Sequence, residues 1–290
     1  MRPRDIEFAR DELKSGDQGL RLRWLGTAGF AIEYQGWVLL IDPYLTRASL
    51  GRCLLSSIEP DLPTIRRYVA GADGIACGHS HFDHVLDVPT IARFTGARVF
   101  GSTSAVTLCR AAGIAADRLH DVQAMGDQSE VRLELGPFEL RFVPSEHSPL
   151  LGGQVPYPGD ITDCHQVPAR MGDYRCGAVF NVAVTVAGRT IYHTGSANLR
   201  DDVSPSIRDI DLLLLCVAGW TATPRLVERL LSKVSPEAVL LSHWDNFFSP
   251  IERGARLMPA IKLPQLVDAL TRQSADLRVG TLPLLGELVL

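Results

Sequence analysis

The segment His79-Ser80-His81-Phe82-Asp83-His84 places four potential metal ligands within six residues. In an extended segment, residues 79, 81 and 83 point to the same side, and residue 84 joins them only if the chain turns directly after Asp83. Asp83 is a favourable N-cap, and residues 85–94 have the spacing of an amphipathic helix. A strand that runs into a helix here would gather three imidazoles and one carboxylate, ligands that suit zinc and also iron or manganese.

A polar turn of surface histidines is the alternative interpretation of this segment. A single histidine would favour that interpretation. Here, however, three histidines follow the apolar run Ile75-Ala76-Cys77, and unpaired imidazoles beside a core are costly. The segment therefore favours a metal site.

The composition is that of an ordinary globular protein. The chain has 290 residues, of which 46% are hydrophobic and 21% charged, enough for a sizeable core. The net charge is -4 and no cluster of Lys and Arg stands out, so we expect no nucleic-acid partner. We expect a small-molecule substrate, and nothing in the composition indicates an oligomeric state.

The cysteines and the N-terminus favour a cytoplasmic protein. None of the six cysteines forms a C-x-x-C pair, and although Cys164 and Cys176 share a loop-like region, reduced thiols are the favoured interpretation. Residues 1–19 lack the apolar core of a signal peptide, and no apolar run reaches membrane-spanning length. Phe247 and Phe248 could meet lipid, but such residues more often line a pocket or a core.

Strand and helix patterns alternate along most of the chain. Strands are predicted over residues 22–25, 30–34, 37–41, 74–77, 98–100, 119–122, 129–135, 138–143, 178–186, 190–193, 211–217 and 238–242. Helices are predicted over residues 61–70, 85–94, 103–113, 224–233 and 263–273. The strands fall into two batches, which favours two sheets packed face to face with helices outside.

We expect one domain over residues 1–290, because no linker or strong repeat interrupts the pattern. Residues 1–19 are polar and predict a loose arm or a short helix, and residues 46–60 predict a loop. Residues 148–177 are rich in Gly and Pro and have no clean periodicity. A loop of that length in a compact domain is usually functional, so we expect a binding loop or a lid there.

Two further histidines follow predicted strands. His147 comes after the strand over residues 138–143, and His243 directly follows the strand over 238–242. Active sites gather in loops at strand ends. The total becomes five histidines and one aspartate, which is enough for two metal ions with open coordination positions.

With these residues in view, the sequence resembles the metallo-β-lactamase superfamily. The family's H-x-H-x-D-H motif is matched in full by residues 79–84, and further matches are Trp24 to Phe30 with Asp42-Pro43-Tyr44, then His147, Tyr192 to Ser196, and His243. The resemblance implies an α+β fold, an αββα sandwich of two mixed β-sheets face to face with helices outside. The one-domain layout and the Trp-Leu-Gly opening are most similar to the branch that contains ascorbate-6-phosphate lactonase and N-acyl-phosphatidylethanolamine phospholipase D.

The resemblance also implies a ligand set for two metals. His79, His81 and His147 would hold one ion, and Asp83, His84 and His243 would hold the other. Ser196 stands where the family's hydrolases commonly have a bridging aspartate. Loss of that charge should weaken the second site, although one subclass of metallo-β-lactamases also has Ser here and keeps two zincs. We therefore expect one firmly bound zinc and a second that is held less strongly, with manganese or iron as alternatives.

For four other residues we expect a structural or supporting role. His193 is expected to be a strand-end residue that is hydrogen-bonded in the core, and His120 a surface strand residue. Asp42 has two interpretations: it could orient a ligand imidazole from behind, or cap the turn before Pro43. Ser196 would support the ligands from behind rather than bind metal.

The predicted function is zinc-dependent hydrolysis, in which metal-bound hydroxide attacks a lactone, ester or phosphoester bond. Asp83 would bind metal and orient the nucleophile, and the metals would stabilise the developing oxyanion. In the loop over 148–177, His165, Arg170 and Arg175 could contact substrate, or be solvated.

Three alternatives remain at this point. A β-lactamase is suggested by Ser196, although the missing export signal argues against that role. Ser196 is also consistent with a non-catalytic or mononuclear metal-binding protein, in which the second site has decayed. An oxidoreductase is the least favoured, since no acidic residue stands at position 196 and no glycine motif for a flavin or nucleotide occurs.

Overall fold

Two mixed β-sheets face each other in the computed structural model, which describes residues 1–14, 19–126, 128–162, 164, 167 and 170–290. Fourteen strands are found in these ranges, seven in each sheet. The first sheet has the order β14 (Glu287–Val289), β1 (Arg21–Gly26), β2 (Gly29–Tyr34), β3 (Trp37–Ile41), β4 (Gly74–Ala76), β5 (Arg98–Gly101) and β6 (Leu119–Asp121). The second has the order β13 (Arg278–Gly280), β12 (Ser235–Ser242), β11 (Asp209–Cys216), β10 (Arg189–His193), β9 (Val179–Val186), β8 (Phe138–Ser145) and β7 (Val131–Leu135).

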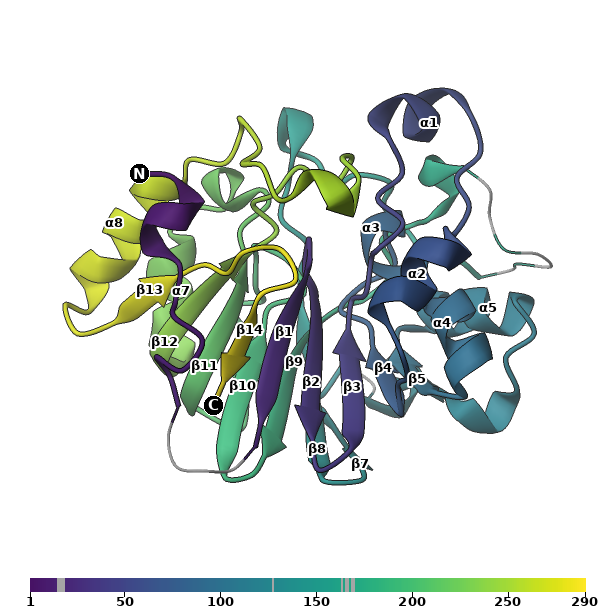
Figure 1. Ribbon diagram of the computed structural model, residues 1–290, viewed down its shortest axis with the longest axis horizontal. Coiled ribbons are helices and arrows are strands. Elements are labelled where there is room, and N and C mark those ends of the chain that lie inside the picture. Colours follow the sequence, from purple (N-terminus) through teal and green to yellow (C-terminus); the bar gives the residue numbers. More distant parts are fainter. Residues whose placement is uncertain (15–18, 127, 163, 165–166, 168–169) are drawn as a thin grey trace.

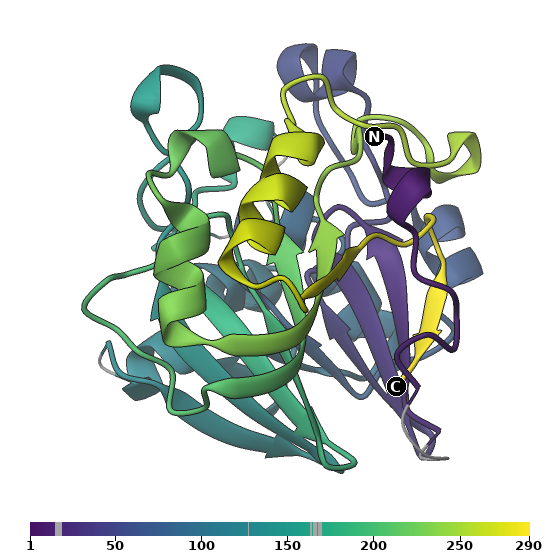
Figure 2. The same ribbon diagram turned by 90° about the vertical axis from the view of Figure 1, so that its left-hand side faces the viewer.

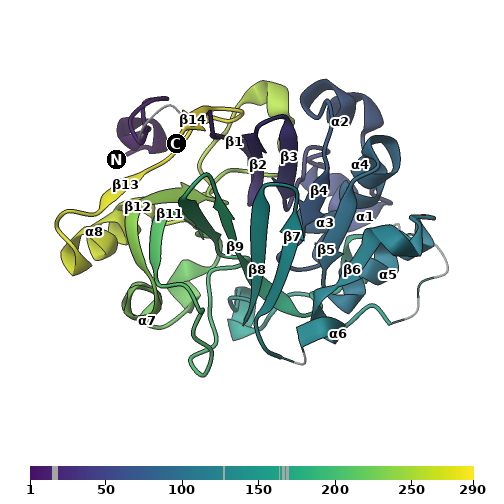
Figure 3. The ribbon, with the colours of Figure 1, turned by 90° about the horizontal axis from the view of Figure 1, so that it is seen from below.

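Each sheet has an antiparallel part and a parallel part. Strands β1 to β3 pair as antiparallel hairpins, and β3 to β6 are parallel. The second sheet is built in the same way, antiparallel from β7 to β10 and parallel from β10 to β13. The view from below shows β1, β2 and β3 facing β7, β8 and β9 across the interior (Figure 3).

Helices cover the outer faces of both sheets. On the first sheet lie α2 (Leu62–Tyr68), α4 (Val88–Thr95) and α5 (Thr103–Ala111), with α1 (Leu50–Leu55), α3 (Phe82–Val85) and α6 (Val122–Gly126) nearby (Figure 1). On the second sheet, α7 (Leu226–Lys233) and α8 (Leu263–Gln273) lie side by side (Figure 2). The αββα sandwich implied by the resemblance is therefore confirmed. None of the helices described here combines the length and apolar character needed to cross a membrane.

The core follows these layers. Between the two sheets pack large apolar side chains from both, including Trp24, Phe30, Phe138 and Phe142, all at most 1% exposed. A second cluster lies between the first sheet and its helices, where Ile75 and Val99 contact α4 and α5. Removing such surface from water is the main stabilising contribution to a fold of this kind.

The helix after the histidine motif begins earlier than the sequence predicts. Asp83 is not an N-cap: α3 starts at Phe82 with His81 at the cap position, and Asp83 lies in the first turn. The single helix expected over 85–94 is also wrong, because α3 ends at Val85 and α4 begins at Val88. Pro89 explains the break, since proline has no N–H to donate and fits only the first turn of a helix.

Other boundaries differ by a few residues. The expected loop over 46–60 contains α1, which Ser49 caps by accepting from the Arg52 N–H. The strand expected over 119–122 ends at Asp121, and Val122 begins α6. Helix α2 is capped by Asp61, α5 is capped by Ser102, and α8 spans the expected residues.

The N-terminal segment is packed rather than loose over residues 1–14. A short 3-10 helix, η1, spans Pro3–Ile6, and Phe8 and Leu13 are each only 7% exposed. Glu7 pairs with Thr281 next to β13, which attaches the segment to the edge of the second sheet. Residues 148–177 contain η3 (Leu151–Gly153) and η4 (Met171–Asp173) but no α-helix or strand in their described part.

Candidate metal centre

Three segments that are far apart in the sequence meet at one end of the two sheets. The histidine motif follows β4, His147 follows β8 and His243 follows β12, so both sheets contribute. His243 has a φ of 59°, a conformation that is uncommon for a residue with a side chain, and its N–H donates to the Thr27 carbonyl at 2.8 Å. This bond ties the end of β12 to the turn between β1 and β2.

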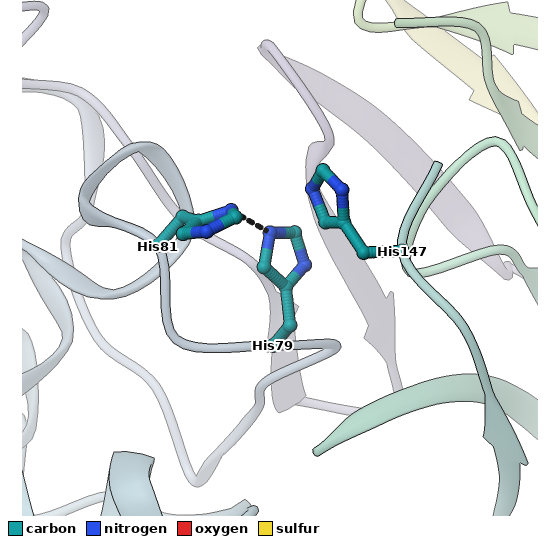
Figure 4. A group of neighbouring side chains, drawn as sticks. All are labelled: His79, His81 and His147. Atoms are coloured by element: carbon teal, nitrogen blue, oxygen red, sulfur yellow. Dashed lines mark hydrogen bonds between the residues drawn. The ribbon is translucent and has the colours of Figure 1, made fainter. Parts of the chain in front are cut away.

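One cluster consists of His79, His81 and His147. One ring nitrogen from each lies within 4.8 Å of the others. The ring of His147 lies beside both of its partners, with ring centroids 4.8 Å from His79 and 4.7 Å from His81 (Figure 4). The three histidines assigned to the first metal are therefore neighbours.

A second cluster adjoins the first. Asp83, His84 and His243 offer ligand atoms that also lie within 4.8 Å of one another. His84 lies next to His79, with ring centroids 3.8 Å apart, and the Nε2 of His243 is 3.2 Å from an oxygen of Asp83. The structure thus brings together all six residues that the sequence predicts as ligands, in the two groups that the resemblance implies.

Four of the five imidazoles donate a hydrogen bond to an oxygen acceptor outside the clusters. The contacts are His79 Nδ1 to the Gly195 carbonyl at 3.0 Å, His81 Nε2 to the Pro156 carbonyl at 2.8 Å, His147 Nδ1 to the Ser148 carbonyl at 2.7 Å, and His84 Nδ1 to Asp42 Oδ2 at 2.8 Å. A carbonyl or carboxylate accepts, so each of these nitrogens must donate. The other nitrogen of each neutral ring then carries a lone pair and is the one available to a metal.

Two such lone pairs face each other. The Nε2 of His79 and the Nδ1 of His81 are 2.9 Å apart, as the dashed line in Figure 4 marks, although the opposite nitrogen of each ring is already the donor. The contact needs either an additional proton or a cation between the rings. Burial and the neighbouring imidazoles lower the pKa of His79 well below its usual value, which disfavours the proton. The donor set therefore fits a divalent cation.

Asp42 lies directly behind His84. Its carboxylate accepts from the Gly78 N–H at 2.6 Å as well as from the imidazole. Burial opposes a charge on His84, but Asp42 outweighs it and raises the pKa of the imidazole above its usual value. A Cβ at position 78 would lie 2.8 Å from Asp42 Oδ2 and 2.9 Å from the Gly195 Cα, so this close approach requires glycine. The contact expected between Asp42 and a candidate ligand is present.

Asp83 supplies a negative charge to the second cluster. Burial alone would raise the pKa of its carboxyl group, but the hydrogen bond from His243 and the nearby imidazoles hold that pKa well below its usual value. At the other cluster, burial and then the neighbouring His81 lower the pKa of His147 to about 3. At neutral pH the ionised carboxylate of Asp83 thus lies beside a first cluster whose imidazoles are neutral, and these are the forms that bind metal.

Ser196 contacts the segment that carries His147. Its hydroxyl oxygen accepts from the Ser148 N–H at 3.1 Å, and the Ser148 hydroxyl donates to the Ala218 carbonyl at 3.0 Å. No described carboxylate replaces the missing bridging group, because Asp201 and Asp202 pair with Arg229 and Arg200 on the surface.

The remaining predicted residues have mixed outcomes. His193 is fully buried at the end of β10 and donates to the Ala28 carbonyl at 2.9 Å, as expected. The expectation of a surface position for His120 is wrong, because the ring is half-buried and stacks on Phe100 with centroids 4.6 Å apart. His165 lies outside the described residues. Arg170 and Arg175 are exposed.

Two aromatic residues and the cysteines are also placed by the structure. Phe247 and Phe248 are half-buried, and both pack on Phe82. Phe247 also makes a T-shaped contact with His243, so it borders the centre. The six cysteines, including Cys164 and Cys176, are reduced and form no disulfide in the described structure.

Sequence reasoning missed a buried ion pair that supports the centre. Arg47 and Asp245 form a salt bridge in which both side chains are fully buried. Asp245 also accepts from the Thr27 N–H at 3.0 Å, next to the carbonyl that holds His243. Asp245 stands two residues after His243, which is a weak signal, whereas nothing in the sequence around Arg47 indicates this contact.

A cavity beside the centre was also not predicted. It has a volume of about 730 Å³, and His147 is among its lining residues. Neither Arg170 nor Arg175 lines it; the arginine that does is Arg200. The sequence could not have indicated the cavity, because its lining comes from many separate segments.

Comparisons with known proteins agree with this architecture. A sequence model described as "Beta-lactamase superfamily domain" matches residues 37–244. A metal-dependent hydrolase of Carboxydothermus hydrogenoformans is 28% identical over 232 residues, which cover 79% of this chain and 86% of that protein.

Solved structures share the fold. Igni18, a metallo hydrolase from Ignicoccus hospitalis, superimposes with a TM-score of 0.55 at 15% identity, covering 93% of this chain and 97% of that one. CmlA, a diiron beta-hydroxylase from Streptomyces venezuelae, gives a TM-score of 0.60 at 16% identity and covers 96% of this chain but 55% of CmlA. At these identities the likeness concerns the fold alone.

Proposed function

The chain belongs to the beta-lactamase superfamily, and from this premise we propose that it is a metal-dependent hydrolase of a small-molecule substrate. The observation that carries the proposal is the contact between His79 Nε2 and His81 Nδ1, where two lone pairs face each other at 2.9 Å, an arrangement that fits a bound cation. The printed name of the relative from Carboxydothermus hydrogenoformans, a metal-dependent hydrolase, supports it.

The proposed metal is zinc, held at two positions. His79, His81 and His147 hold the first ion, and Asp83, His84 and His243 hold the second. The first is the firmer, since Ser196 offers no bridging carboxylate to balance two dications. Imidazole and carboxylate also suit iron and manganese, so the metal content decides between them. Reduced cysteines without a disulfide suit a reducing compartment, and we propose a cytoplasmic location.

The reaction is hydrolysis of a lactone, ester or phosphoester bond. When bound, the metal supplies a Lewis acid and lowers the pKa of a water molecule. Asp83 is ionised and buried, so its carboxylate can accept a hydrogen bond from the attacking water and orient it. The acceptors behind the histidines keep their rings in fixed orientations and prevent them from turning away from the centre.

Metal analysis of matched variants tests the proposal. Purified wild-type protein should contain between one and two equivalents of zinc and hydrolyse members of a panel of p-nitrophenyl esters, lactones and phosphodiesters. His81→Ala should lose both properties. His120→Ala removes a half-buried histidine outside the centre and should keep both. Full metal content in His81→Ala would refute the ligand assignment, and metal without turnover of any panel member would favour the non-catalytic alternative.

A further inference from the structure

The cavity beside His147 is built from both halves of the sandwich. On one side lie residues from the end of β8 and the start of β9, among them Pro144, Val179 and Phe180. On another side lie Val122 and Ala124 of α6. Helix α6 contacts β7, the edge strand next to β8, and the view from below shows α6 on this side of the molecule (Figure 3). We call this cavity the β8–α6 groove.

The groove leads away from the metal centre. His147 belongs both to the first cluster and to the groove lining, so the groove adjoins the candidate metal centre at this residue. Loop residues Val155, Pro158 and Gly159 complete the lining. Its volume of about 730 Å³ lies in the range of small-molecule sites.

Charge in the groove is almost balanced before anything binds. Besides His147, the charged or titratable side chains among the described lining residues are Glu146, Arg200 and the buried thiol of Cys176. Arg200 is engaged by Asp202 through two hydrogen bonds of 3.1 and 2.6 Å. Burial raises the pKa of Cys176 to about 12, so this thiol is neutral.

Away from the metal centre, an anionic group in the groove would therefore find one cation among the described lining residues, Arg200, which Asp202 already engages. It would have to displace Asp202 from Arg200 and would meet the carboxylate of Glu146. Burying a charge without a partner is costly, whereas an apolar group gains from contact with Ala178, Val179 and Phe180. Polar uncharged side chains also line the groove (Thr103, Gln123, Gln128, Ser129 and Ser145), so the lining disfavours charge and accepts hydrocarbon along its apolar part.

We infer that the β8–α6 groove binds an uncharged, largely apolar part of the substrate, such as a medium-length acyl or alkyl chain. The inference rests on the proposed hydrolase function for the other end of that molecule, which lies at the metal centre. Among the substrates considered above, it selects an ester or lactone with a hydrocarbon chain over a compound with a second anionic group.

Chain-length selectivity is the first measurement. The metal-loaded protein should hydrolyse p-nitrophenyl octanoate with a kcat/KM at least about tenfold higher than that for the acetate, because each buried methylene contributes to binding. Ala178→Phe and Ala124→Phe, which add bulk from opposite sides of the groove, should bring that ratio towards one. The control is Ala275→Phe, at an exposed position after α8, which should keep the wild-type ratio. Equal ratios in all four proteins would overturn the inference.

Binding of a probe that cannot be hydrolysed separates the groove from the chemistry. N-octyl dansylamide, a neutral sulfonamide, should bind the metal-loaded wild type at least about tenfold more tightly than 8-(dansylamino)octanoate, which carries a charge at the end of the same chain. Ala178→Phe and Ala124→Phe should weaken binding of the neutral probe, and Ala275→Phe should not.

Together, the two experiments distinguish a failure of the groove inference from a failure of the hydrolase proposal. If the neutral probe binds as described but no ester or lactone is hydrolysed, the groove stands and the hydrolase proposal falls. If esters are hydrolysed without chain-length dependence and both groove variants bind the probe like wild type, the hydrolase stands and the groove inference falls. Tighter binding of the charged probe would also overturn the inference.

Discussion

Arg47 and Asp245 form a fully buried ion pair that joins the segment after β3 to the segment after β12. Arg47 also donates from Nε to the Ser249 carbonyl at 2.8 Å and from Nη2 to the Asn246 carbonyl at 3.0 Å. The chain that carries His243 is therefore held on both sides, by Thr27 through its backbone and by Arg47 just beyond it. Four predictions follow from this relationship and from others in the centre.

Arg47→Met should destabilise the protein and selectively reduce occupancy of the second metal position. Removing one partner from a buried pair leaves an unpaired charge, which costs about 3 to 5 kcal/mol of unfolding free energy. Urea unfolding and zinc stoichiometry measure the two effects. Arg10→Ala breaks an exposed pair with Glu287 and should cost no more than about 1 kcal/mol. Equal zinc content in Arg47→Met and wild type would contradict the link to His243.

Asp42→Asn should weaken zinc binding by about 10- to 100-fold, because His84 loses the carboxylate that orients its ring. The Asn amide oxygen can still accept from the Gly78 N–H, so the backbone contact is kept. Competition with a chromophoric chelator measures the affinity. The control is Asp61→Asn at the N-cap of α2, where asparagine caps equally well. An unchanged affinity in Asp42→Asn would show that the ring needs no such support.

Removal of metal should lower the unfolding temperature, and zinc should restore it. A ligand that binds only the folded state stabilises it by about 2.7 kcal/mol at 100 times its dissociation constant. The loss should be large here because lone pairs of His79 and His81 then face each other unscreened. Calorimetry after EDTA treatment and dialysis measures the shift. His81→Ala, which leaves the ligands of the second position intact, should give a clearly smaller response to both steps, and a full response in that variant would count against the assignment.

Asp87 should make stability fall as the pH rises from about 4 to about 6. Burial raises the pKa of its carboxyl group to about 6, although it accepts hydrogen bonds from the backbone of Leu45 and Thr46. The folded state then binds more protons than the unfolded state in this pH window. The contribution of Asp87 to the free energy of unfolding is therefore complete below the window and lost above it.

One unit of pKa shift corresponds to about 1.4 kcal/mol, so the raised pKa of Asp87 should lower the free energy of unfolding by roughly 3 kcal/mol from one end of the window to the other. Asp87→Asn has no titrating group and should lack this part of the pH profile. The difference between the two unfolding free energies isolates the contribution, because metal binding and the other titrations are shared. Parallel profiles would mean that the hydrogen bonds keep Asp87 at its ordinary pKa.

The sequence indicated the fold and the six candidate ligands because both depend on local patterns. A motif of four ligands in six residues, and a histidine after each of two strands, are visible in the chain itself. The exact start of α3 was not, because the cap at His81 is decided by the geometry of the centre. The break before α4 has a local cause, Pro89, which the periodicity of residues 85–94 masked. Propensity alone favoured Asp83 as the cap.

Features that depend on distant pairs could not be predicted. The burial of Arg47 depends on a partner 198 residues away, and the stacking of His120 on Phe100 depends on the pairing of β5 with β6. The packed N-terminal segment is a similar case, since Phe8 is buried only where it meets residues near the other end of the chain, such as Gly280. In each case the residues that surround the side chain in the sequence do not indicate which distant residue it contacts.

The order of the ligands along the chain has a consequence for biosynthesis. A nascent chain that has emerged as far as residue 84 has two of the three imidazoles of the first cluster, and His147 completes that cluster while the second still lacks His243. During synthesis the first cluster therefore has all of its candidate ligands about midway through the chain, and the second only near the end. A polypeptide that ended between His147 and His243 would carry every candidate ligand of the first cluster but not of the second.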